Sequence, residues 1–157
     1  MMDYIFDITP LEFKGCLISI LCGFLIGFER QWNGKPAGIR TSILICLGAY
    51  TFVAIGNYYQ PSVGSVRLVG QIVTGVGFMG GGVILTREGL VQGVTSAAII
   101  WLLAGIGSLC GLQNYITALW LTGFAITVLL GITIFENVIA QLNRGVHRKQ
   151  NNTSIKK

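Results

Sequence analysis

The sequence predicts an all-α integral membrane protein with five transmembrane helices, and three observations lead to this fold class. Hydrophobic residues make up 52% of the 157 residues and charged residues only 11%, whereas a soluble domain averages about 25% charged residues. The mean hydropathy is +0.68. No Asp, Glu, Lys or Arg occurs from Gly89 to Phe135, a stretch long enough for two helices that each cross a bilayer.

The first predicted helix begins with residues 9–12, Thr-Pro-Leu-Glu, which have the pattern of a capping box with proline at the first helical position. The helix runs to Glu29. Gly23 and Gly27 form a GxxxG face, a pattern typical of close helix packing in membranes. The polar segment 30–40 is predicted to be a loop because it contains the turn-forming pairs Asn-Gly and Lys-Pro.

The third predicted helix is rich in glycine, with six glycines between residues 67 and 85. Because glycine costs a helix interior about 1 kcal/mol relative to alanine, this density needs a packing reason. We therefore expect this helix to be the central one of the bundle, with Arg67 and Gln71 turned inward. Residues 86–93 are predicted to be a loop, and residues 111–114 form the turn that divides the long uncharged stretch.

The five predicted spans cover residues 10–29, 41–59, 68–86, 94–110 and 115–135. They form one membrane domain, residues 1–142, in which an amphipathic segment continues the fifth helix and is followed by a basic tail, residues 143–157. The glycines assigned to helix packing are Gly23, Gly27, Gly75, Gly77, Gly80, Gly82, Gly107 and Gly111.

Charge distribution predicts the orientation in the membrane. An odd number of spans places the two termini on opposite sides. With the N-terminus outside, nine Lys/Arg residues lie inside and two lie outside, a strong positive-inside bias. The outside pair is Lys14 and Arg67. We therefore expect the N-terminus outside and the C-terminus in the cytoplasm. Because the N-terminus is acidic and lacks a basic n-region, we expect no cleavable signal peptide.

Polar groups within or beside the spans are the candidates for function, because charges there are costly. Arg67 and Gln71 lie one helical turn apart on one face of the helix. Either both line an outer vestibule, or Arg67 reaches the lipid headgroups and Gln71 forms a hydrogen bond with a neighbouring helix. Glu29 and Arg40 lie on the same side and are expected to pair across the loop as a structural clamp. Thr95, with the serine after it, fits the N-cap of the fourth helix.

The sequence contains no motif for catalysis, cofactors or nucleic acid. It has no P-loop and no Ser-His-Asp set, and its single histidine lies in the basic tail. The four cysteines lie in apolar segments without metal-type spacing. We expect neither an enzyme nor a bound metal or cofactor. The net charge of +5 reflects the tail, which fits contact with anionic lipid rather than nucleic acid.

Four ordered blocks closely resemble the MgtC/SapB family of bacterial membrane proteins: GFLIGFERQ, AGIRTSILICLGA, RLVGQIVTGVGFMGGGVI and GVTSAAIIWLLAGIGSLCG. The resemblance covers residues 23–111. It implies functional roles for the polar residues Glu29, Arg30, Arg40, Thr41, Arg67, Gln71 and Thr95. The chain departs from the family pattern at Gly64, where the family usually carries an aspartate. It resembles the short members that lack a C-terminal ACT-like domain.

The resemblance implies a multi-pass protein of the bacterial inner membrane that serves magnesium homeostasis or adaptation to low Mg²⁺ and, in pathogens, virulence. It implies action by binding and modulating other membrane proteins, such as the F-type ATP synthase. Two alternatives remain open: a small transporter or channel for Mg²⁺ or another ion, and a scaffold that forms homo-oligomers through its GxxxG faces.

Overall fold

The computed structural model describes residues 9–59, 64–87, 90–132 and 135. Its helices are α1 (Phe13–Trp32), α2 (Ile39–Tyr59), α3 (Gly64–Gly82) and α4 (Val94–Gly111), and a fifth helix covers Tyr115–Ile132. Between α3 and α4 lie the short strands β1 (Leu85–Arg87) and β2 (Leu90–Gln92). The all-helical prediction with five helices therefore holds for the described residues, apart from this hairpin. The predicted basic tail, 143–157, lies outside them.

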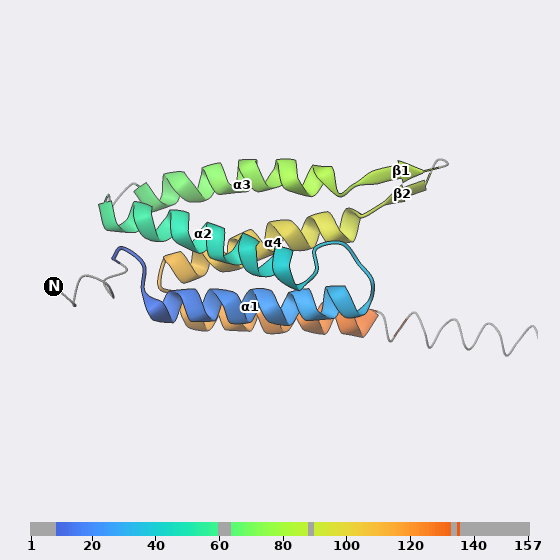
Figure 1. Ribbon diagram of the computed structural model, residues 1–157, viewed down its shortest axis with the longest axis horizontal. Helices are drawn as coiled ribbons and strands as arrows, with labels where there is room; N and C mark the ends of the chain where they lie inside the picture. The colour runs from blue at the N-terminus through green and yellow to red at the C-terminus, as the bar shows by residue number, and fades with distance from the viewer. Residues whose placement is uncertain (1–8, 60–63, 88–89, 133–134, 136–157) are drawn as a thin grey trace, which may run out of the picture. The chain divides into compact units, whose positions relative to one another are not determined.

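The chain divides into two compact units, Met1–Gly123 and Phe124–Lys157. In the first unit α1, α2, α3 and α4 run alongside one another in alternating directions (Figure 1). The β1–β2 hairpin lies at the end of this unit where α1 and α3 finish and α2 and α4 begin. We call this the hairpin end. In the described part of the second unit, Phe124 to Ile132 form the last turns of the fifth helix.

The helix boundaries follow local sequence chemistry. The first helix ends at Trp32, three residues after the predicted end at Glu29. Asn33 caps it through a backbone N–H bond to the Glu29 carbonyl, and Gly34 then adopts a left-handed φ of 61°. Glycine takes this conformation without a steric penalty, so it stops the helix. At its other end α1 begins at Phe13, three residues later than the sequence predicts. Glu12 occupies the N-cap position without a side-chain cap bond, so the predicted capping box does not form.

The predicted loop at 86–93 contains an antiparallel hairpin instead. Leu85 pairs with Gln92 and Thr86 with Val91. The helix before it stops at Gly82, because the N–H groups of Val83 and Ile84 bond carbonyls only three residues back. Successive glycines weaken the helix there, and the β-branched residues that follow favour strands.

The core of the first unit lies where α2 meets α1 and α4. Its largest fully buried side chains include Tyr50, Ile26, Ile100 and Leu103. The α2 helix contacts α1, α3 and α4, whereas in α3 the buried residue among those whose burial is described is Gly80. The prediction that α3 is the central helix is therefore wrong, because α3 packs only one side against its neighbours.

Three helices of the described part are long and apolar enough to cross a membrane: Ile39–Tyr59, Val94–Gly111 and Tyr115–Ile132. Their bounds agree with the predicted second, fourth and fifth helices to within three residues. Agreement is good here because a long apolar run defines a helix without reference to its neighbours.

Candidate functional site

A buried ion pair forms the centre of a polar cluster at the hairpin end. Arg30 and Glu29 lie in the last turn of α1 and are only 4% and 8% exposed, and Arg30 Nη1 lies 3.8 Å from Glu29 Oε2. Arg30 Nη2 also donates a hydrogen bond of 2.9 Å to Ser96 Oγ in the first turn of α4. A buried charge is tolerated only when it is paired and hydrogen-bonded, so these contacts tie α1 to α4.

The same cluster fixes the end of α1. Asn33 Nδ2 donates to Glu29 Oε1 at 2.7 Å and to the Glu29 carbonyl at 3.1 Å. The backbone N–H of Lys35 donates to the Arg30 carbonyl at 2.9 Å. Glu29 Oε2 and Arg30 Nε, both buried, have no hydrogen-bond partner among the described residues. The cluster is thus charged, enclosed and held mainly by short-range contacts.

The loop between α1 and α2 packs against this cluster. Ala37 is buried with a left-handed φ of 62°, and its carbonyl accepts a 2.9 Å hydrogen bond from Ser42 Oγ. Gln31 Oε1 accepts from the Ile39 N–H at 3.3 Å. A Cβ added at Gly27 would lie 2.7 Å from Ile39 Cα, so only glycine lets α1 and α2 come this close.

Several predicted site residues lie outside the buried cluster. Arg40, Thr41 and Thr95 are exposed. Glu29 pairs with Arg30 and not with Arg40, so the expected clamp across the loop is not formed. The N-cap of α4 is Gly93, at a φ of 89° and without a side-chain bond. Thr95 and Ser96 lie inside the helix. The Ser96 hydroxyl accepts the hydrogen bond from Arg30 and does not cap the helix.

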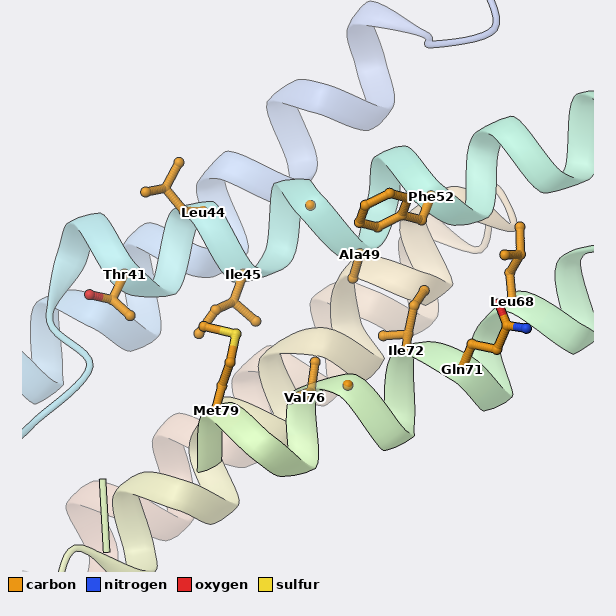
Figure 2. A pocket seen from close by; sticks show the side chains of 12 residues that line it. Thr41, Leu44, Ile45, Ala49, Phe52, Leu68, Gln71, Ile72, Val76 and Met79 are labelled. Carbon is orange, nitrogen blue, oxygen red and sulfur yellow. The ribbon is translucent and has the colours of Figure 1, made fainter. Parts of the chain in front are cut away.

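Arg67 and Gln71 are both exposed. The predicted inward orientation is therefore not observed within the described chain. Gln71 lines a groove between α2 and α3 (Figure 2), and Arg67 lies one turn before it. The exposed position of Arg67 and Gln71 is compatible with both alternatives, an outer vestibule and contact with the lipid headgroups.

The predicted packing glycines fall into two groups. A Cβ at Gly23 would lie 2.7 Å from Ile43 Cα, and one at Gly111 would lie 2.6 Å from Val53 Cβ. Gly107 meets Cys46 and Ala49 in the same way, and Gly80 faces Ala97. By contrast, a Cβ at Gly75, Gly77 or Gly82 would meet nothing within 4 Å. These three glycines have no packing role inside the described chain.

A second polar network, at the opposite end of α1, was missed by sequence reasoning. The Glu12 carboxylate accepts hydrogen bonds from Gln113 Nε2 at 2.5 Å and from the Tyr115 hydroxyl at 2.7 Å. The Tyr50 hydroxyl accepts from the Glu12 N–H at 2.7 Å and donates to the Glu12 carbonyl at 2.9 Å. The residues around Glu12 have the pattern of a capping box. This short pattern carries no information about hydrogen-bond partners that lie 38 to 103 residues away.

The His, Cys, Asp and Glu side chains of the described residues are scattered. In the part of the chain that the structure describes, no group of three or more His, Cys, Asp or Glu side chains could hold a metal ion. Cys22, Cys46 and Cys110 are buried, and Cys16 is half-buried. The buried cluster can hold the end of α1 against the start of α4, and one side of α3 is exposed.

Blocks that are far apart in the sequence meet at the hairpin end. The GFERQ block ends α1, the AGIRT block begins α2, and the GVTSAA block begins α4, where it receives the Arg30 hydrogen bond. The last turn of α3 joins them through the contact of Gly80 with Ala97. This convergence makes the hairpin end the candidate functional site of the first unit.

Comparison with known proteins identifies relatives of this chain. "Protein MgtC" of Salmonella typhimurium (strain 14028s / SGSC 2262) is 46% identical over 104 residues, which cover 66% of this chain and 44% of that protein. "Protein MgtC" of Brucella abortus (strain 2308) is 42% identical over 93 residues, covering 59% of this chain and 39% of that protein. The chain thus matches less than half the length of these relatives. No solved structure matches it.

A family model describes most of the same region. The model of the MgtC family matches residues 16–138. This range includes all four sequence blocks, the buried cluster and the five helices, apart from the first three residues of α1. This is well over half of the 157 residues. The chain therefore belongs to the MgtC family.

Proposed function

We propose that this protein is a non-enzymatic, multi-pass protein of the bacterial inner membrane that binds and modulates another membrane protein. The observation that carries the proposal is an unpartnered face of α3. We call it the open glycine face; it consists of Gly70, Thr74, Gly77, Phe78 and Gly81.

The open glycine face has the geometry of a helix-docking surface. Its residues follow the spacing i, i+4, i+7, i+8 and i+11, which places them on one side of an α-helix. A Cβ at Gly70, Gly77 or Gly81 would meet nothing within 4 Å, and Phe78 is 89% exposed. Small residues let a second helix approach closely in a bilayer, where packing replaces the hydrophobic drive between helices.

The proposed partner and physiological role come from the family. We propose a role in adaptation to low Mg²⁺, with the F-type ATP synthase as the first partner to test. The buried cluster contributes to the docking surface through the position of α3. It ties the end of α1 to α4, and α4 in turn contacts α3, so it helps to hold α3 in place while the glycine face stays open.

The test compares two leucine variants in the full-length protein. Gly77→Leu fills the open glycine face, whereas Gly105→Leu places the same side chain on α4, at another glycine whose Cβ would meet nothing within 4 Å. Each tagged protein is purified from bacterial membranes in a mild detergent, and ATP synthase subunits are quantified by mass spectrometry. We expect Gly77→Leu to reduce partner recovery about tenfold, equivalent to about 1.4 kcal/mol, and Gly105→Leu to match the wild type.

Two results would count against the proposal. One is equal recovery of partner by the two variants. The other is cation uptake by proteoliposomes that contain only the wild-type protein, because this would favour the alternative of a small transporter or channel for Mg²⁺ or another ion. Growth in low-Mg²⁺ medium, measured for the same variants in a deletion strain, connects partner binding to the physiological role.

A further inference from the structure

A groove with a volume of about 640 Å³ lies between α2 and α3. Figure 2 shows side chains of the two helices facing one another across it, with Ile45 and Met79 near one end and Phe52, Leu68 and Gln71 near the other. The volume lies within the range of about 300–1,000 Å³ that small-molecule sites occupy. The groove is therefore large enough for a ligand.

The walls of the groove are suited to hydrocarbon. Apart from Thr41 and Gln71, the lining side chains are apolar, and the two glycines Gly48 and Gly75 create the space. A Cβ at either glycine would meet nothing within 4 Å. Water gains too few hydrogen bonds in such a site. Because α2 is long and apolar enough to cross a membrane, the natural occupant is the hydrocarbon around it.

The length of the groove matches one leaflet. Along α3 its lining runs from Leu68 to Met79, and eleven residue steps at about 1.5 Å each give about 17 Å. Half of a hydrocarbon core of about 30 Å is about 15 Å. An extended acyl chain from one leaflet would therefore fill the groove from end to end.

Polar groups are placed where the headgroup of such a lipid would lie. Gln71 lines the groove near its Leu68 end (Figure 2). Arg67 precedes Gln71 by four residues, which puts the two side chains next to each other on the helix surface. Arg67 is exposed and forms no ion pair with any other residue in the described ranges. A guanidinium is well suited to a phosphate, which it can bind with two parallel hydrogen bonds.

We infer that this groove binds an anionic phospholipid, with one acyl chain between α2 and α3 and the headgroup phosphate on Arg67 and Gln71. The charge of Arg67 complements the phosphate, and the apolar walls complement the chain. The acyl-chain groove and the glycines of the open glycine face lie on different sides of α3, because Gly75 and Gly77 are about 200° apart around the helix. The inference therefore goes beyond the proposed function and does not depend on it.

Native mass spectrometry of the full-length protein in detergent tests the site with two lipids that share acyl chains, palmitoyl-oleoyl phosphatidylglycerol and palmitoyl-oleoyl phosphatidylcholine. We expect the wild type to retain phosphatidylglycerol about fivefold better, the preference that one arginine near a membrane surface provides. Arg67→Gln should bind both lipids equally. Gly75→Leu should lose both, and the control Gly77→Leu should behave as the wild type.

A thermal melt of each variant, with and without phosphatidylglycerol, provides the second measurement. If Gly75→Leu fails to fold, Gly48→Leu blocks the groove from the opposite wall and should abolish the lipid-dependent rise in melting temperature. Equal retention of the two lipids by the wild type would overturn the inference. So would wild-type lipid binding by a folded groove-filling variant, or a second copy of the chain that occupies the groove and displaces the lipid.

Discussion

At the scale of single residues, the structure explains how a guanidinium is accommodated inside a small membrane protein. Arg30 is 4% exposed and reaches both Glu29 and Ser96. Burying a charge carries a large desolvation free energy, which is offset only by charged or hydrogen-bonding partners with good geometry. Ser96 matters here because its hydroxyl comes from another helix, so the bond that stabilises the charge also joins α1 to α4.

We predict that Ser96→Ala destabilises the protein by about 1–3 kcal/mol, because it leaves a buried charged donor without its hydrogen bond. Ser108→Ala is the matched control. Ser108 is also buried on α4, but its hydroxyl donates to the Ala104 carbonyl of its own helix, and loss of such a bond costs little. Thermal unfolding in detergent checks both variants. Equal melting temperatures for the two would show that the Arg30 bond contributes no stability.

At the scale of elements, the glycines have two distinct roles. Gly23 and Gly27 bring α1 against α2, and Gly107 and Gly111 bring α4 against α2. Any side chain at these positions would overlap a neighbouring helix. A Cβ at the glycines of the open glycine face would meet nothing within 4 Å in the described chain. Their effect is to leave this side of α3 without side chains at these positions. The same residue type thus closes one interface and leaves another open.

We predict opposite stability changes for two alanine variants of α4. In Gly107→Ala the new methyl group would lie 2.9 Å from Ala49 Cβ, and such overpacking destabilises by about 1–3 kcal/mol. In Gly105→Ala the methyl group meets nothing within 4 Å, so the better helix propensity of alanine stabilises by up to about 1 kcal/mol. Melting temperatures that move in the same direction for both variants would contradict the assigned interface.

At the scale of the whole molecule, the expected orientation in the membrane depends on where the charges lie. Alternating helix directions in the first unit place the 30–40 loop and the hairpin at one end, and the turn after α4 at the other. Lys35, Arg40 and Arg87 therefore belong to the hairpin end, and Arg67 to the opposite one. Basic residues favour the cytoplasmic side, so we expect the hairpin end to face the cytoplasm.

Two single substitutions test this orientation. Lys35 and Asn114 are both exposed and lie at opposite ends of the first unit, whereas three of the four native cysteines are buried. In intact spheroplasts a membrane-impermeant maleimide should label Asn114→Cys above the native background, and it should label Lys35→Cys only after lysis. The reverse pattern would place the N-terminus of the protein in the cytoplasm.

Local signals explain which features could be predicted from the sequence. The apolar runs predicted the helices of the described chain, and the Asn33–Gly34 pair predicted a turn between the first two helices, because run length and turn chemistry act within a few residues. The capping box at Glu12 failed for the same reason. Its pattern is local, whereas the Tyr50 hydroxyl that holds the Glu12 backbone lies on another helix.

By itself the sequence determined the helical class, the approximate helix bounds and the blocks that mark the MgtC family. Only the tertiary structure decided that Arg30 bonds Ser96, that α2 rather than α3 contacts three helices, and that Gly75 and Gly77 face open space. The physical reason is that periodicity identifies a face of a helix but not its neighbour. Partners that lie tens of residues apart are selected by packing of the whole bundle.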